Sequence, residues 1–349
     1  MKKWPTTIQK QLLLLFCIVI FCLAVVGLNK DYSLTIIHTN DLHSHFFAVD
    51  NNMQDCHEGA DCLGGFAKLY TFVLKERQQD PNILLLDAGD RFSGTYFYTL
   101  HKEKDLIPIF QKLQYDAFTL GNHEFDDDLN TLSTFLQNVS TPAICANISI
   151  PQNSPVKNLI HPSTIVQKNG LKIGIIGVTT PNIAQSAMYG DSVQLKPLIE
   201  SIQKEIAFQK QQGINFHILL SHLGLDQDIE TAKNIPELDL IVGGHTHDLL
   251  SNTMKAVAPY PIAITRSKNK TLIVTAGAFN RFVGKLQLKI NKKGQITSAT
   301  GNTYPLDQSI QESLEISQYI HQKERELDTL LSKPIATLIE SISLTPNKD

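Results

Sequence analysis

The sequence alternates short apolar runs with longer stretches in which apolar residues recur every three or four positions. The short runs predict buried strands, and the longer pattern predicts amphipathic helices. Nine strands are expected, at residues 34–40, 82–89, 116–121, 143–148, 171–179, 216–223, 238–244, 271–277 and 285–291. Helices are expected at residues 64–79, 127–139, 198–213 and 226–235. Strands that alternate with helices predict an α/β domain.

The N-terminus departs from this pattern. Three lysines within the first ten residues precede an unbroken apolar run at residues 12–28, and the polar stretch "NKDYS" follows. A positive flank before an apolar core is typical of a secretory signal peptide, but a run of this length also reaches the short limit for a membrane anchor. We therefore expect residues 1–28 to be a signal peptide or a signal anchor. Either alternative exports the remainder, which places it in the periplasm, outside the cell or at the cell surface.

Composition and charge narrow the classes of function. The chain has 349 residues, 42% of them hydrophobic, which is enough for a sizeable core. Its formal net charge at pH 7 is -3, and the basic residues are spread along the sequence. Proteins that bind polyanions concentrate their cations on one surface or segment. We therefore expect no nucleic-acid partner.

The cysteines agree with export. Cys56 and Cys62 flank a short polar stretch that is rich in turn-forming residues, and we expect a disulfide between them in an oxidising compartment. Closing this loop would contribute about 2 kcal/mol to stability. A metal-binding pair is the alternative, but structural zinc sites need four ligands, and no partner cysteines are present for them. Cys145, in an apolar run, is expected to be an inert buried thiol.

Polar residues follow five of the expected strands at their carboxyl ends. The stretches are "TNDLHSH" (residues 39–45), "DAGDRFSGT" (87–95), "GNHEFD" (121–126), "SHLG" (221–224) and "GGHTHD" (243–248). Open α/β sheets bind ligands outside the carboxyl ends of their strands, so residues that are distant in sequence are brought together there. Residues two apart in an extended chain share a face. Asp41 with His43, and His245 with His247, can therefore present paired groups to one cleft.

Each of these residues alone also has a structural explanation. A histidine at a strand end is more often hydrogen-bonded support than a ligand, and Asp or Asn before glycine is an ordinary turn former. We assign His38, Asp87 and Glu124 to structural support and His217 to the core. The joint occurrence of five polar stretches on five strands is improbable by chance, so together they predict a ligand site.

These motifs, in this order, resemble those of the calcineurin-like metallophosphoesterases. The stretches "HTNDLHSHF", "GGFAKL", "GVTTP" and "RFVGKLQL" are in addition similar to the N-terminal domain of secreted 5'-nucleotidases and UDP-sugar hydrolases. The resemblance covers residues 34–332. It implies a four-layer αββα sandwich at residues 32–308 that holds two metal ions. A long charged helix, at residues 309–333, is expected to lead out of this domain as a linker.

The resemblance also assigns the site residues by motif position. One metal ion is expected to be held by Asp41, His43, Asp90 and His247. The other is expected to be held by Asp90, Asn122, His222 and His245. His123 and Asp126 fall on the catalytic pair of the family, and Asn122 and His123 are expected to contact the substrate.

Elementary chemistry supports a ligand shared by both ions. Two divalent ions about 3.5–4 Å apart repel each other by about 18 kcal/mol at an effective dielectric constant near 20, so an anion must lie between them, and Asp90 is the natural bridge. With Asp41, Asp90 and a bridging hydroxide, the site carries a net charge of about +1, which attracts a phosphoryl dianion. The hydroxide would displace the leaving group in line, without a covalent enzyme intermediate.

The remaining assignments concern the catalytic pair and the metals. His123 would lie beside the leaving oxygen or the developing equatorial charge, and Asp126 would orient its ring. The alternative for Asp126 is a helix-capping carboxylate, because a helix is expected to begin at this point. Imidazole, carboxylate and amide ligands without thiolate suit zinc, manganese, cobalt or iron better than calcium.

The function expected from these residues is hydrolysis of a nucleotide or another small phosphoester, of the 5'-nucleotidase type. Hydrolysis of UDP-sugars, 2',3'-cyclic nucleotides or sulfur esters is an alternative, because related sites serve several leaving groups. A catalytically weak fragment or a silent metal-binding scaffold is the alternative from another class. The presence of every expected ligand favours the enzyme.

The C-terminus differs from the resembled nucleotidases, in which a further domain follows the linker helix and stacks the base on aromatic side chains. Residues 334–349 resemble the first strand of that domain and nothing more, so we expect the C-terminal substrate domain to be missing. The chain would then be a fragment, a truncated gene product or a single-domain form. Without base stacking, worth about 1–3 kcal/mol, simple aryl phosphates should be cleaved about as readily as nucleotides.

Overall fold

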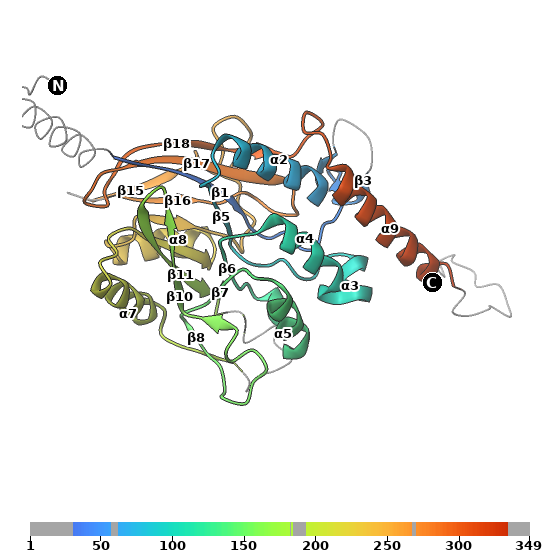
Figure 1. Cartoon of the computed structure of the whole chain (residues 1–349), viewed down its shortest axis with the longest axis horizontal. Coiled ribbons are helices and arrows are strands. Elements are labelled where there is room, and N and C mark those ends of the chain that lie inside the picture. Colours follow the sequence, from blue (N-terminus) through green and yellow to red (C-terminus); the bar gives the residue numbers. More distant parts are fainter. Residues whose placement is uncertain (1–30, 57–61, 182, 184–192, 267–269, 334–349) are drawn as a thin grey trace, which may run out of the picture.

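The computed structural model describes residues 31–56, 62–181, 183, 193–266 and 270–333 (Figure 1). The expected signal or anchor at residues 1–28 and the C-terminal residues 334–349 lie outside these ranges. No helix within the described ranges is both long and apolar enough to cross a lipid bilayer.

Two β-sheets form the centre of the molecule (Figure 1). The first has the order β18-β17-β1-β5-β6-β7-β9, and its strands are β1 (Tyr32–Thr39), β5 (Leu84–Asp87), β6 (Ala117–Thr119), β7 (Ala143–Ile144), β9 (Ile160–His161), β17 (Phe282–Ile290) and β18 (Ile296–Pro305). The second has the order β10-β11-β13-β14-β16-β15, with β10 (Ser163–Lys168), β11 (Leu171–Thr179), β13 (His217–His222), β14 (Leu240–Val242), β15 (Ile262–Thr265) and β16 (Lys270–Val274). Strands β1, β5, β6, β7 and β9 run parallel in the first sheet, as do β11, β13, β14 and β16 in the second.

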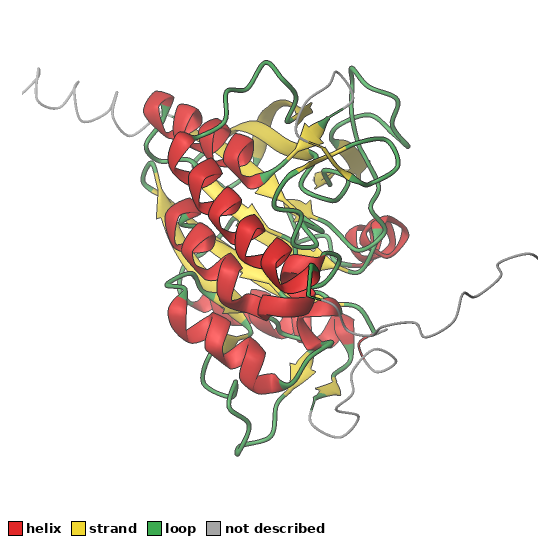
Figure 2. Ribbon diagram, turned by 90° about the vertical axis from the view of Figure 1, so that its right-hand side faces the viewer, coloured by secondary structure: helices red, strands yellow, loops and turns green. Residues whose placement is uncertain are grey.

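Helices cover the outer faces of both sheets (Figure 2). The first sheet packs against α2 (Phe66–Gln79), α3 (Tyr96–His101), α4 (Leu106–Leu113), α5 (Leu129–Asn138) and α9 (Leu314–Leu331). The second packs against α7 (Leu198–Gln211) and α8 (Leu225–Asn234). Two short 3-10 helices, η1 (Lys102–Asp105) and η2 (His123–Phe125), complete the helical elements of the described ranges.

Three apolar layers hold these elements together. Successive side chains of a strand point to opposite faces of its sheet. In β1, Ile36 therefore packs between the two sheets with Ile175 and Leu220, whereas Ile37 packs under the helices of the first sheet. A third layer lies between the second sheet and its two helices. The four-layer αββα sandwich is thus confirmed.

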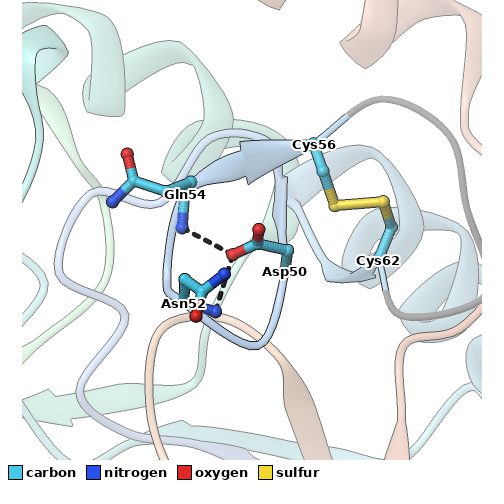
Figure 3. Close-up of a disulfide and its surroundings, with 5 residues drawn as sticks. All are labelled: Asp50, Asn52, Gln54, Cys56 and Cys62. Carbon is cyan, nitrogen blue, oxygen red and sulfur yellow. Dashed lines mark hydrogen bonds between the residues drawn. A yellow bond between two sulfur atoms is a disulfide. The ribbon is translucent and has the colours of Figure 1, made fainter.

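A small three-stranded sheet of β2 (Ala48–Val49), β3 (Asp55–Cys56) and β4 (Leu63–Gly64) follows β1. The expected disulfide joins Cys56 to Cys62, whose Cα atoms lie 5.8 Å apart (Figure 3). In the turn before β3, the Asp50 carboxylate accepts hydrogen bonds from the backbone N–H groups of Asn52 and Gln54, at 2.8 and 2.9 Å (Figure 3). The turn therefore fixes the β2–β3 hairpin, and the disulfide ties β3 to the residue before β4.

Two predicted elements differ in the structure. The strand predicted at residues 143–148 ends after β7, and a separate short strand, β8 (Ile148–Ser149), pairs with β12 (Gln194–Leu195). The chain leaves the first sheet there because the Ala146 N–H donates to Gly177 O in β11 of the second sheet, at 2.7 Å. The linker helix begins at Leu314 rather than near residue 309, because the Ser313 side chain caps its first turn.

Candidate active site

Residues from five strand ends and from both sheets meet at one end of the sandwich. Asp41 and His43 follow β1, Asp90 follows β5, Asn122 and His123 follow β6, His222 ends β13, and His245 and His247 follow β14. The Asp90 carboxylate connects the two sheets, because its Oδ2 atom lies 3.0 Å from His222 Nε2 and 3.9 Å from His43 Nε2. The structure therefore brings together the residues that the motifs selected.

Within the described ranges, three groups of three side chains offer ligand atoms that lie within 4.8 Å of one another. The groups are Asp41, His43 and His247; Asp90, His222 and His245; and His43, Asp90 and His123. The first group corresponds to one expected metal site without the shared ligand Asp90. The second corresponds to the other expected site without its amide ligand, Asn122. The third shows that Asp90 and His43 also approach the His123 ring.

The donor atoms fit metal ions in spacing and in kind. His43 Nε2 and His247 Nε2 lie 3.1 Å apart, and two nitrogen ligands at about 2.0–2.1 Å from one ion are about 2.9–3.4 Å from each other. Asn122 Oδ1 is buried and has no hydrogen-bond partner among the described residues. Because buried acceptors are normally paired, this oxygen is a candidate ligand atom.

A backbone carbonyl on the side away from the cluster orients the His222 ring. Its Nδ1 atom lies 2.7 Å from Ala88 O, so Nδ1–H donates to that carbonyl and Nε2 faces the cluster. A hydrogen bond of this kind fixes the tautomer of many metal-binding histidines. Burial alone would lower the pKa of His222, but the Asp90 and Asp41 carboxylates raise it to about 10. The two carboxylates therefore favour positive charge at this position.

Asp41 is held by contacts from distant parts of the sequence. Asn40 Nδ2 donates to Asp41 Oδ2 at 2.7 Å, and Asn40 is fixed in turn by Gly277 O and the Ala276 N–H. The His245 N–H points at both Asp41 oxygens, at 3.1 and 3.0 Å. The carboxylate is thus set in position before any ligand binds.

Five of the candidate ligands have left-handed backbone conformations, which are uncommon outside glycine. The φ angles are 51° at Asp41, 47° at His43, 56° at Asp90, 83° at His245 and 57° at His247. Such conformations cost about 1–3 kcal/mol each and cluster at functional sites. Their concentration here indicates that the loops are shaped for the side chains they present.

Glu124 and Arg91 fix the two central loops. The buried Glu124 carboxylate accepts hydrogen bonds from the N–H groups of Asp90 at 3.0 Å, Arg91 at 2.8 Å, Phe92 at 3.3 Å and Gly121 at 2.6 Å. The Arg91 guanidinium, also fully buried, lies 3.5 Å from Glu124 Oε1 and 2.9 Å from Asp87 Oδ1. One carboxylate therefore joins the "GDRF" loop to the "GNHE" loop.

We predict that Glu124→Gln lowers the free energy of unfolding by about 3 kcal/mol, because it places an NH₂ group against backbone donors and removes charge opposite a buried guanidinium. The measurement is urea denaturation followed by circular dichroism. Glu315→Gln is the matched control: Glu315 pairs with Lys112 at the surface, and its loss should change stability by less than about 1 kcal/mol. Equal effects in the two variants would contradict the role given to Glu124.

His123 and Asp126 form a hydrogen-bonded pair beside the cluster. His123 Nδ1 lies 2.5 Å from Asp126 Oδ2, and the Ser93 hydroxyl donates to the same oxygen at 2.7 Å. The hydrogen bond to Asp126 raises the pKa of His123 to about 9, although burial opposes it. The backbone N–H of His123 also donates to Asp90 Oδ1 at 2.9 Å. The pair is thereby tied to the residue that connects the two sheets.

Asp126 does not cap the following helix. The N-terminus of α5 is capped by Asp128, whose carboxylate accepts from the Thr131 N–H at 2.8 Å. The alternative interpretation of Asp126 as the capping residue is therefore wrong.

The structure adds residues that the motif analysis missed. They are Asn40, Arg91, Ser93 and Phe279. The Phe279 ring packs against His43 at 5.5 Å, His45 at 5.1 Å and His247 at 4.9 Å between ring centroids. Three of the added residues lie in the same sequence motifs as the assigned residues, so their position in the motifs could have identified them: Asn40, Arg91 and Ser93. Phe279 follows no polar motif, so the sequence gives no comparable signal for it.

Comparisons with known proteins agree with this geometry. The family model described as Calcineurin-like phosphoesterase matches residues 34–249. A 5'-nucleotidase of Rattus norvegicus is 32% identical over 319 residues, which are 89% of this chain and 55% of the relative. A snake venom 5'-nucleotidase of Naja atra is 33% identical over 319 residues, which are 88% of this chain and 60% of the relative.

Solved structures show the same likeness. The crystal structure of a 5'-nucleotidase precursor from Thermus thermophilus has a TM-score of 0.80 at 28% identity, and the match covers 87% of this chain and 61% of that one. The chain therefore spans little more than half the length of the curated relatives named above.

Proposed function

Because the chain belongs to the calcineurin-like phosphoesterase family, we propose that it is a metal-dependent phosphoester hydrolase that releases phosphate from nucleotides. The observation that carries the proposal is the position of Asp90. Its carboxylate lies between His222 of the second sheet and His43 of the first, at 3.0 and 3.9 Å. A carboxylate flanked by histidine nitrogens from both sheets is suited to hold two cations at short separation.

The two metal positions follow from the side chains that meet there. Asp41, His43 and His247 would hold one ion, and His222, His245 and Asn122 the other, with Asp90 shared. The donor set suits zinc, manganese, cobalt or iron. When bound, these ions activate a water molecule and stabilise negative charge on the phosphoryl group.

The negative charge of the side chains at this site is smaller than the positive charge that two divalent ions would bring. Asp41 and Asp90 are the only carboxylates in the two metal groups within the described ranges. The loaded site therefore keeps net positive charge, which attracts a phosphate ester. We propose that Asn122 and His123 contact the phosphate oxygens, because the His123 ring groups with His43 and Asp90.

The role we assign to His123 is hydrogen-bond or proton donation to the leaving oxygen. The 2.5 Å bond from Nδ1 to Asp126 orients the ring and favours the protonated imidazolium. The ring is partly exposed, with 36% of its side-chain surface accessible, so a substrate can reach Nε2. Donation to a leaving group by a positioned histidine contributes about 10²- to 10⁴-fold to rate.

Nucleotides are the proposed substrates because the relatives found in the comparisons are named 5'-nucleotidases. UDP-sugars and 2',3'-cyclic nucleotides stay alternatives, since the same metal chemistry serves several leaving groups. We also propose that residues 32–308 form the catalytic domain and that the protein is exported. The Cys56–Cys62 disulfide supports export, because disulfides persist in oxidising compartments.

The test is metal-dependent phosphate release. The 349-residue chain, loaded with zinc or manganese, should release phosphate from adenosine monophosphate; EDTA should stop the reaction, and added metal should restore it. A panel of UDP-glucose, 2',3'-cyclic adenosine monophosphate and simple phosphomonoesters identifies the preferred substrate. No release from any of these, with two equivalents of metal shown to be bound, would refute the proposal.

A further inference from the structure

A pocket of about 420 Å³ adjoins the candidate active site and takes no part in the metal groups. It is lined by His45, Met53, Gln54, Asp55, Gly94, Thr95, Tyr96 and Thr99. The lining comes from the loop after β1, from the β2–β3 hairpin and from α3 with the residues before it. Its volume lies in the range of pockets that hold small ligands.

The segment from Ser93 to Tyr96 connects this pocket to the catalytic pair. The Ser93 hydroxyl donates to Asp126 Oδ2 at 2.7 Å. Three residues of extended chain span at most about 11 Å, so the backbone of Tyr96 lies within that distance of Ser93. The lining of the pocket therefore begins close to the residue that contacts the catalytic pair.

Gly94 brings the pocket against the metal-binding loop. It has a φ of 103°, and a Cβ atom at this position would lie 2.6 Å from His43 O. The next residue, Thr95, donates its hydroxyl to Ser44 O at 3.0 Å. Because glycine has no side chain, the two loops can approach closely, and no side chain of residue 94 separates the pocket from the metal-binding loop.

The pocket offers an aromatic and a thioether surface to solvent. Tyr96 is 67% exposed and Met53 37% exposed, whereas the next two aromatic residues of α3, Phe97 and Tyr98, are buried. Met53 lies 3.9 Å from the Arg281 guanidinium, which holds it at the turn. Planar rings pack well on tyrosine and methionine side chains.

His45 forms part of the wall of the same pocket. Its side chain is buried, at 6% exposure, and its ring packs edge-on against Phe279. Among the residues that the structure describes, His45 Nδ1 has no hydrogen-bond partner. This nitrogen is itself inaccessible to solvent, so His45 contributes to the pocket wall through its other atoms.

We propose that this pocket is a leaving-group subsite, in which a planar aromatic group of the phosphoester, a nucleobase or an aryl ring, stacks on Tyr96. The inference rests on the proposed function. It adds that the catalytic domain itself selects the class of leaving group. Alkyl phosphates have no ring to stack, so the subsite discriminates against them.

The test compares three substrates in the metal-loaded full chain: adenosine monophosphate, phenyl phosphate and glycerol 2-phosphate. Tyr96→Ala should raise KM about tenfold for the first two, which is the loss expected for a stacked ring. KM for glycerol 2-phosphate should stay within about twofold. Tyr96→Phe should retain the wild-type values, because the ring and not the hydroxyl is responsible. Phe208→Ala is the matched control, since Phe208 is an exposed aromatic residue, at 53%, on the distant α7.

The outcomes separate the subsite from the proposed function. A selective rise in KM for both aromatic substrates supports the subsite, and a rise for adenosine monophosphate alone supports it with the nucleobase as its ligand. Equal losses on all three substrates, or no change on either aromatic one, would overturn it. An inactive wild-type enzyme with bound metal would instead refute the proposed function.

Discussion

Asp90→Asn should lower the metal content at both positions and reduce phosphate release by at least about 10³-fold. Asp90 Oδ2 lies 3.0 Å from His222 Nε2 and 3.9 Å from His43 Nε2, so the substitution removes the negative charge that both ions would share. The amide keeps the size of the carboxylate and one oxygen that can accept from the His123 N–H, as Asp90 Oδ1 does at 2.9 Å. The variant therefore changes charge and leaves the loop in place.

The measurement is inductively coupled plasma mass spectrometry of the dialysed protein, together with steady-state kinetics. Asp41→Asn is the matched control. Asp41 belongs to only one metal group, with His43 and His247, so this variant should lose about one equivalent and keep the other. Two full equivalents in the Asp90 variant would show that Asp90 is not the shared ligand.

The interior strands are predictable because their sequence signal is unambiguous. The apolar pattern predicts a strand at residues 171–179, and β11 spans Leu171–Thr179. This strand is buried almost throughout, so its sequence is a nearly continuous apolar run. The edge strand β18 is not predicted, because its sequence "ITSATGNTYP" is fully buried at only one position and has no apolar run.

Helix α4 shows a second limit of sequence patterns. Its segment "LIPIFQKL" contains Pro108 near the start of the helix, and proline argues against helix in most contexts. In the first turn the missing N–H costs nothing, because that N–H has no partner within the helix anyway. Which rule applies depends on where the helix begins, and the short 3-10 turn at Lys102–Asp105 sets that point.

The candidate ligands can be predicted from the sequence motifs, whereas the contacts that position them cannot. Arg91 reaches Thr119 O at 2.6 Å, and Asn40 reaches Gly277 O at 2.5 Å, across 28 and 237 residues of sequence. These contacts depend on how strands from distant parts of the chain lie beside each other. The left-handed conformations of Asp41 and Asp90 cannot be predicted from the sequence either, because they occur at residues other than glycine.

His123→Ala should leave both metal positions filled and slow turnover by about 10²- to 10⁴-fold. The imidazole would be lost, but the backbone N–H that donates to Asp90 Oδ1 at 2.9 Å is retained in alanine. The ring is oriented by Asp126, at 2.5 Å, and that bond favours the charged form. Its removal therefore takes away a donor beside the leaving group and leaves the carboxylate cluster unchanged.

The same variant decides between two roles for His123. Its ring lies within 4.8 Å of ligand atoms of His43 and Asp90, a position that suits either a donor to the substrate or a further metal ligand. If it is the donor, His123→Ala keeps two equivalents of metal while kcat falls. Asp126→Asn, which keeps the ring but weakens its orientation, should then slow turnover by a smaller factor. Loss of one metal equivalent would make His123 a ligand instead, and unchanged turnover would remove it from the mechanism.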